Sequence, residues 1–298
     1  MPVDAYREKR RITIVAAAVN AVLAVVKIVG GVVGQSQALV VDGVHSLSDL
    51  ASDGLILGAA RIGARGPDSN HPFGHARFET AATLALAAIL LLVAGGFAYD
   101  AVLRLLLADQ HGDPGWLALA VAVLSVVANE GVYQGTARVA VRAESEMLRA
   151  NAWHHRSDAL SSLVVIFGVL GAMAGLPWLD GVAALVVALM IGAIGWRLGW
   201  EAGRELVDTG LDADGLAGIR ASALRVNGVL GISDLRTRRM GPRTLVTIRV
   251  RIDPAITAGE AHAICVAVRH GLRADIDSVG EVFVGIDAGR EAVPGDPQ

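Results

Sequence analysis

The sequence predicts an α-helical membrane protein with six transmembrane helices and a C-terminal α+β domain. Of its 298 residues, 53% are hydrophobic and only 18% are charged, which is too apolar a composition for a soluble protein of this length. Long apolar segments continue to about residue 200, and a mixed, charged sequence follows. These two observations separate a membrane domain from a smaller domain outside the membrane.

Six apolar segments are long enough to cross about 30 Å of hydrocarbon, which takes roughly 20 helical residues. They extend over residues 12–34, 38–60, 81–107, 116–137, 150–175 and 176–200. Lys and Arg flank the first segment and occupy alternate connections, whereas residues 35–37, 108–115 and 175–180 contain neither. By the positive-inside rule, both termini are cytoplasmic. We therefore expect a multi-pass integral membrane protein, of the bacterial inner membrane.

The remainder of the chain alternates between helical and strand periodicity. The predicted elements are a helix at 212–226, strands at 229–239 and 244–252, a helix at 257–275 and a strand at 281–286. Thr257 and Glu260, at the start of the second of these helices, have the spacing of a capping box. This αββαβ order predicts a small cytosolic domain. The chain then divides into a transport domain (1–207), a regulatory and dimerisation domain (208–290) and a disordered tail (291–298).

Net charge and cysteine content exclude binding to nucleic acid and sites built from several cysteines. The formal net charge is −3, so the chain lacks the basic excess that binding to nucleic acid requires. Cys265 is the sole cysteine, which excludes an intrachain disulfide or a thiolate cluster within one chain.

Two matching His-x-x-x-Asp pairs interrupt the second and fifth apolar segments. His45 precedes Asp49, and His154 precedes Asp158, by four residues, so each pair shares one face of its helix. Ionisable groups are costly in a bilayer and are found there chiefly where they line a pathway or meet a partner. Two nitrogens and two carboxylates suit a tetrahedral divalent cation. The sequence therefore predicts one intramembrane metal site formed by both pairs.

Neighbouring polar residues have more than one interpretation. Asp42 lies three residues before His45, where it is either a hydrogen-bond partner that orients the imidazole or a residue of the helix end. His155 and Arg156 fall off the face that carries His154. We expect these two side chains to meet another helix, lipid headgroups or water.

Two further stretches resemble motifs of the cation diffusion facilitator (CDF) family. Residues 71–79 (HPFGHARFE) resemble the motif that enters the third span, and residues 151–160 (NAWHHRSDAL) resemble that of the fifth. The resemblance covers nearly the whole chain. It implies a homodimeric transporter, not an enzyme, with a ferredoxin-like cytosolic domain and no prosthetic group. It also implies exchange of cytosolic Zn²⁺ or a related divalent ion for protons, with the two His–Asp pairs as the transport site.

The same resemblance implies a second metal site at Asp68, His71 and His75, between the second and third spans. An alternative stays open, because Asp68 suits an ordinary turn and His75 suits the start of the third span. In the cytosolic domain the family's zinc-binding histidines are replaced by residues 233, 249 and 285, namely Ser, Arg and Gly. Only His262 and Asp287 remain there as weak candidate ligands.

The predicted function is efflux of a divalent cation from the cytoplasm. Ligands bind metal only when deprotonated, so protons and metal compete for one site. A set of two His and two Asp favours Zn²⁺ first and Fe²⁺ second. Four protein ligands leave no open position for an activated water, which disfavours an enzyme. The alternative is a membrane-bound metal sensor or assembly scaffold that binds metal without transporting it.

Overall fold

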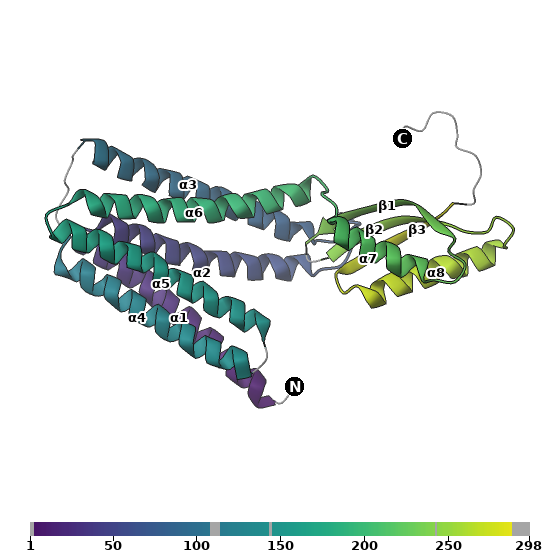
Figure 1. The fold of residues 1–298 in the computed structure, drawn as a ribbon, viewed down its shortest axis with the longest axis horizontal. Helices are drawn as coiled ribbons and strands as arrows, with labels where there is room; N and C mark the ends of the chain where they lie inside the picture. The colour runs from purple at the N-terminus through teal and green to yellow at the C-terminus, as the bar shows by residue number, and fades with distance from the viewer. Residues whose placement is uncertain (1–2, 108–113, 143–144, 242, 288–298) are drawn as a thin grey trace. The chain divides into compact units, whose positions relative to one another are not determined.

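Six long helices and a small sheet domain make up the structure, a computed structural model that describes residues 3–107, 114–142, 145–241 and 243–287. The long helices are α1 (Val3–Val33), α2 (Gln37–Gly63), α3 (Arg77–Leu107), α4 (Trp116–Arg142), α5 (Glu146–Met173) and α6 (Trp178–Leu206) (Figure 1). The predicted tail, 291–298, lies outside the described residues. Two compact units are present: residues 1–57 with 85–199, and residues 58–84 with 200–298.

Five of the long helices are apolar enough to cross a membrane. The segments that qualify within the described residues are 11–33, 77–107, 116–142, 148–173 and 178–206. The chain is therefore a multi-pass membrane protein. The second long helix, α2, is outside this set and carries three aspartates, Asp42, Asp49 and Asp53. Carboxylates in this helix lower its hydropathy, and they include the proposed metal ligand Asp49.

Several observed helices are longer than the predicted apolar segments. The fourth continues to Arg142, the fifth begins at Glu146 and the sixth continues to Leu206. An apolar run marks only the part of a helix that suits hydrocarbon. The backbone hydrogen bonds of a helix can continue past that run into polar sequence, so hydropathy underestimates helix length here.

Close contacts between small residues hold the first unit together. A Cβ on Gly168 of α5 would lie 2.4 Å from the Cβ of Ala183 on α6. A Cβ on Gly43 of α2 would lie 2.8 Å from the backbone nitrogen of Ile28 on α1. Such small residues let membrane helices approach closely. The core between the helices includes Leu39, Leu86, Val121, Val165, Val187 and Ile191.

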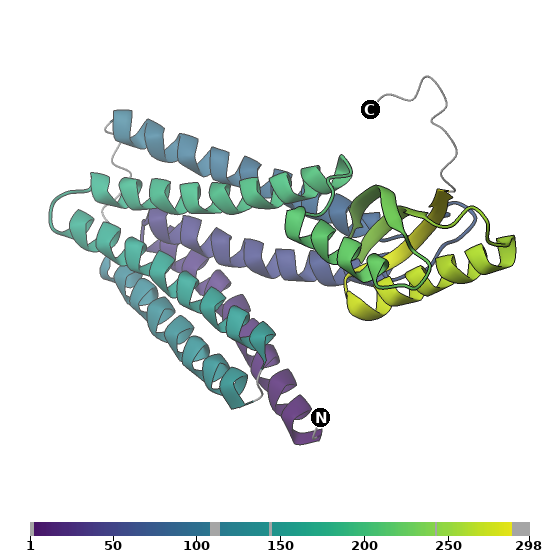
Figure 2. The ribbon, with the colours of Figure 1, turned by 45° about the vertical axis from the view of Figure 1, so that its right-hand side comes forward.

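The second unit contains the predicted αββαβ order. Its elements are α7 (Ala213–Leu224), β1 (Gly231–Met240), β2 (Arg243–Arg251), α8 (Ala258–Asp275) and β3 (Val279–Asp287) (Figure 2). The sheet order is β1-β2-β3, with β1 antiparallel and β3 parallel to β2. A parallel neighbour requires a crossover connection, which α8 provides. The predicted capping box of Thr257 and Glu260 begins α8.

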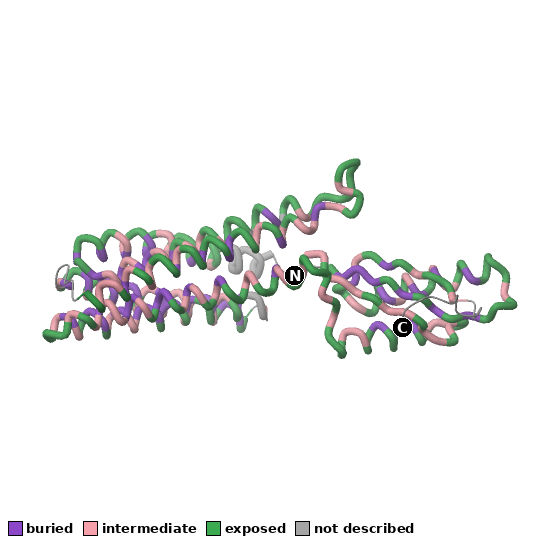
Figure 3. The backbone as a smooth tube through the Cα atoms, turned by 90° about the horizontal axis from the view of Figure 1, so that it is seen from above, coloured by how far each residue is buried: buried purple, intermediate pink, exposed green. Residues whose placement is uncertain are grey.

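Alternation of apolar and polar residues explains the core of this second unit. Val246, Ile248 and Val250 of β2 are buried, while the intervening Thr247 and Arg249 are exposed. The buried side chains pack with Val268 and Leu272 of α8. Figure 3 shows buried positions along the strands of this unit.

Candidate metal centre

The α2 half of the site has the geometry that the four-residue spacing predicts. His45 and Asp49 are one helical turn apart, and the Nδ1 of His45 lies 3.7 Å from the Oδ2 of Asp49. His45 is buried, and the Oδ2 of Asp49 is a buried acceptor without a hydrogen-bond partner in the described structure. Unpaired buried acceptors are uncommon, and a bound cation or proton would satisfy this one.

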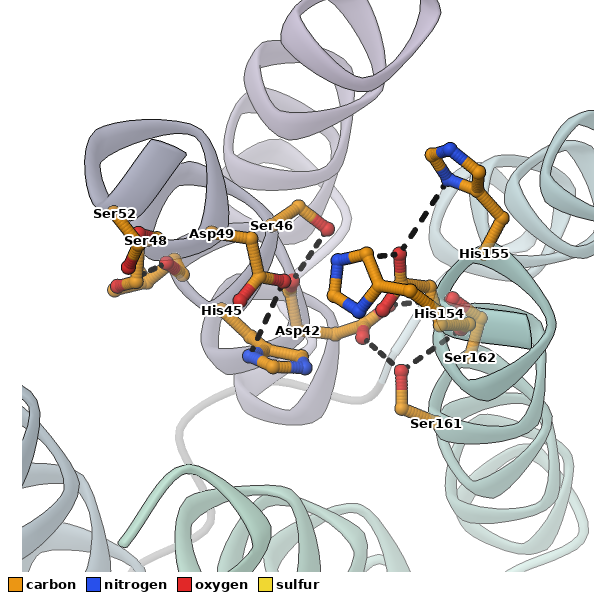
Figure 4. Close-up of polar contacts among 12 residues, drawn as sticks. Asp42, His45, Ser46, Ser48, Asp49, Ser52, His154, His155, Ser161 and Ser162 are labelled. Atoms are coloured by element: carbon orange, nitrogen blue, oxygen red, sulfur yellow. Dashed lines mark hydrogen bonds and ion pairs between the residues drawn. The ribbon is translucent and has the colours of Figure 1, made fainter. Parts of the chain in front are cut away.

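Asp158 of α5 completes a group of three ligands. It is only 4% exposed, and one ligand atom from each of His45, Asp49 and Asp158 lies within 4.8 Å of the other two. Figure 4 shows the α2 side chains opposite those of α5. Ligand residues that are more than 100 positions apart in the sequence, on α2 and α5, therefore bring one imidazole and two carboxylates together.

His154, the fourth predicted ligand, lies beside this group and is not part of it. Its Nε2 is 3.8 Å from the Oδ2 of Asp158, and its side chain is 43% exposed. The structure thus brings three of the four predicted ligands together and places the fourth at the edge of the site.

The expectation for His155 is met only in part. Its side chain is only 3% exposed, so it packs inside the protein and does not meet lipid headgroups or water, and its Nδ1 lies 3.9 Å from the Oδ2 of Asp158. Neither ring nitrogen has a hydrogen-bond partner among the described residues. Its spacing of three residues before Asp158 also places it on the same helix face, which is the signal that the sequence reasoning missed. Arg156 does meet another helix, donating to the Tyr133 hydroxyl at 3.1 Å.

Asp42 has partners other than the predicted one. It pairs with Lys27 of α1, with Nζ to Oδ2 at 2.8 Å. It also accepts hydrogen bonds from the hydroxyls of Ser161 (2.9 Å) and Ser162 (2.7 Å) on α5. No hydrogen bond to His45 is present among the described contacts. Asp42 therefore joins three helices instead of orienting the imidazole.

A second cluster of three ligand groups lies in the connection between α2 and α3. The Oδ1 of Asp68 lies 3.2 Å from the Nδ1 of His71, and its Oδ2 lies 3.3 Å from the Nε2 of His75. Asp68 also accepts from the backbone N–H groups of Asn70 and His71. The carboxylate therefore makes an ordinary Asx turn and at the same time faces two imidazoles.

These hydrogen bonds affect the charge of the exposed carboxylate. The backbone N–H of His71, followed by that of Asn70, lowers the pKa of Asp68 below its usual value. Donors to the ionised form stabilise it. Asp68 therefore stays negative near neutral pH without any help from a metal.

The two candidates in the cytosolic domain stay isolated. His262 is exposed on α8, and Asp287 ends β3 with its Oδ2 3.9 Å from the Nε of Arg251. Neither belongs to a group of three ligands in the described part of the chain.

Comparisons with known proteins agree with this architecture. Residues 13–207 match the family model described as the cation efflux transmembrane domain. Residues 211–288 match that of the cytoplasmic domain of cation efflux proteins.

Three curated relatives match over most of their length. Metal tolerance protein 2 of Oryza sativa subsp. japonica is 35% identical, over 90% of this chain and 76% of that protein. An uncharacterized transporter of Methanocaldococcus jannaschii is 32% identical, over 94% and 99%. The manganese efflux system protein MneP of Bacillus subtilis is 27% identical, over 93% and 95%. On the matches to both family models and to these relatives, the chain belongs to the cation diffusion facilitator family of divalent metal transporters.

Proposed function

We propose that this protein exports a divalent metal cation from the cytoplasm in exchange for protons, with the metal bound between α2 and α5. Proteins of this family are transporters without a prosthetic group, and metal ions are their cargo. The observation that carries the proposal is the convergence of His45, Asp49 and Asp158 within 4.8 Å. Two carboxylates also compensate the charge of a dication in a low-dielectric region.

We propose His154 as the fourth ligand. Its Nε2 lies 3.8 Å from Asp158, so a rotation of its side chain would bring the imidazole to an ion held by the other three residues. The resulting set of two His and two Asp would suit tetrahedral coordination of a metal ion. Metal binding would then close the site from its exposed edge.

Proton exchange follows from the chemistry of the ligands. Imidazole binds metal only when it is neutral, and carboxylates bind only when ionised, so metal and protons compete. The imidazole side chain changes charge near neutral pH. In secondary transporters, a site near the bilayer midplane usually opens first to one side of the membrane and then to the other, because groups of helices rock about it.

The proposed cargo is Zn²⁺ first and Fe²⁺ second, because nitrogen and oxygen ligands in a tetrahedral set favour them. One relative is named as a manganese efflux protein. Mn²⁺ is therefore included in the same measurement, which tests whether the ligand set itself favours Zn²⁺ and Fe²⁺ over Mn²⁺.

The proposed topology has six spans, with both termini in the cytoplasm. A helix of 27 residues such as α2 is about 40 Å long, which exceeds the thickness of the hydrocarbon core. Two of its carboxylates, Asp42 and Asp49, face α1 and α5 instead of requiring lipid contact. We also propose a homodimer, a ferredoxin-like cytosolic domain and a boundary between the domains at residues 207–208.

The experiment is metal uptake into vesicles that contain the purified protein, under an imposed proton gradient. Zn²⁺, Fe²⁺ and Mn²⁺ are compared for the parent, Asp49→Asn and Asp158→Asn. Glu130→Gln is the matched control, because this α4 carboxylate accepts a hydrogen bond from Gln134 of its own helix. We expect gradient-driven flux in the parent and the control, and flux at background in both aspartate variants.

The alternative function has a distinct outcome in that experiment. A parent protein that binds metal but shows no flux under either polarity of the gradient overturns the transporter. That result favours a membrane-bound sensor or scaffold, in which the Asp68 cluster would be a further metal-binding element.

A further inference from the structure

A buried ion pair lies next to the proposed metal site. The Nζ of Lys27 is 2.8 Å from the Oδ2 of Asp42, and both side chains are 0% exposed. Charged groups inside a membrane are costly and usually mark function. The proposed ligands His45, Asp49 and Asp158 do not include this pair, so the presence of two buried charges here needs a separate explanation.

The pair is connected to the metal site through hydroxyl groups. Asp42 accepts one hydrogen bond at each carboxylate oxygen, from Ser161 and from Ser162 of α5. The Ser161 hydroxyl also lies 2.8 Å from the carbonyl oxygen of Asp158. Figure 4 shows Asp42 of α2 linked in this way to the two serines. The polar contacts between α2 and α5 therefore sit within one helical turn of a proposed ligand.

The backbone of α1 approaches α2 at the same level. A Cβ on Gly43 would lie 2.9 Å from the Cβ of Lys27 and 2.8 Å from the backbone nitrogen of Ile28. Only the hydrogen of glycine fits at such distances. This close approach places the Lys27 ammonium next to Asp42. The ammonium also donates a hydrogen bond of 3.1 Å to the hydroxyl of Ser46, the residue after His45.

We propose that Lys27, Asp42, Ser161 and Ser162 form a positioning network that keeps the α5 ligands opposite the α2 ligands when the site holds no metal. This inference rests on the proposed function. Carboxylates that share a site disfavour each other's charge, and Asp49 and Asp158 share one here. The hydrogen bonds from α5 to Asp42 oppose the separation of the two helices, and Lys27 neutralises Asp42.

The sharpest test removes the α5 hydroxyls and leaves the ion pair intact. In the full-length Ser161→Ala/Ser162→Ala variant, we expect the Zn²⁺ dissociation constant to rise at least tenfold. The KM for Zn²⁺ flux in vesicles rises with it. Ser125→Ala is the matched control, because Ser125 is equally buried but donates only to the Val121 carbonyl of its own helix. Its Zn²⁺ affinity stays at the parent value.

A rescue separates positioning from a loss of folding. Ser161→Ala/Ser162→Thr keeps one hydroxyl on α5, and we expect it to recover most of the lost affinity. A parent-like dissociation constant and KM in the double alanine variant overturn the positioning network while leaving the transporter intact. A parent that binds none of Zn²⁺, Fe²⁺ and Mn²⁺ instead overturns the proposed function, and the network with it.

The ion pair gives a second, independent measurement. Lys27→Met or Asp42→Asn alone leaves one buried charge without its partner, whereas the combined variant leaves none. We expect the combined variant to bind Zn²⁺ more tightly than either single variant. Additive losses from the two single substitutions contradict the pairing on which the network depends.

Discussion

Two clusters in this protein each bring three potential metal ligands within 4.8 Å of one another, yet they differ in how their polar atoms are satisfied. In the connection between α2 and α3, Asp68 has a side chain that is 48% exposed and accepts hydrogen bonds from two backbone N–H groups. In the membrane domain, Asp49 has a buried oxygen with no donor in the described structure.

This difference distinguishes a carboxylate that already accepts backbone hydrogen bonds from one with a buried oxygen that has no donor in the described structure. Buried polar atoms without partners cost free energy, which a cation or a proton would recover. An exposed carboxylate in a turn is already solvated and hydrogen-bonded. Ligand convergence alone therefore does not identify the transport site, whereas convergence with unsatisfied, buried acceptors favours the α2–α5 site.

The largest expected effect comes from the same substitution made in both clusters. Asp49→Asn removes a ligand charge from the buried site, and we expect Zn²⁺ flux to fall by more than the roughly 10–100-fold that loss of a supporting partner costs. Asp68→Asn should lower flux by less than about tenfold, because its cluster lies outside the pathway in our proposal. Uptake of Zn²⁺ into vesicles measures the flux of both variants. An equal loss of flux in the two variants would contradict the proposed difference between the two clusters.

A smaller effect is expected from the helix contact that supports the buried cluster. Gly43→Ala places a methyl group 2.8 Å from the α1 backbone, and overpacking of this kind costs about 1–3 kcal/mol. Gly54→Ala in the same helix meets open space, so it should be neutral or slightly stabilising. Thermal unfolding of the purified protein compares the two. A destabilisation of the same size in both variants argues against close α1–α2 packing at Gly43.

The sequence predicted what depends on local spacing. The four-residue interval places His45 and Asp49 on one helix face, and alternating apolar and polar residues predicted the strands at 229–239 and 244–252. Thr257 and Glu260 marked the start of α8 in advance. These features depend on neighbours within a few residues, so a single sequence is sufficient to find them.

Contacts between distant segments were not predictable in the same way. Spacing alone leaves both His154 and His155 within reach of Asp158, and the rotation of α5 about its axis decides which is buried. The pairing of Lys27 with Asp42 depends on how closely α1 and α2 pack. That packing is determined by Gly43 and by the whole bundle, not by the sequence near either charge.

The smallest expected effect is the titration of Asp68 in the exposed cluster. Hydrogen bonds from the His71 and Asn70 backbone hold its pKa below the usual value of 3.8. A lowered pKa in the folded state means that the turn gains stability above pH 3.8 and loses it as the pH falls through the folded pKa. Carboxyl NMR titration of the metal-free protein should show a midpoint below 3.8. A midpoint at or above that value would mean that the backbone hydrogen bonds of the turn do not stabilise the ionised Asp68 in the folded protein.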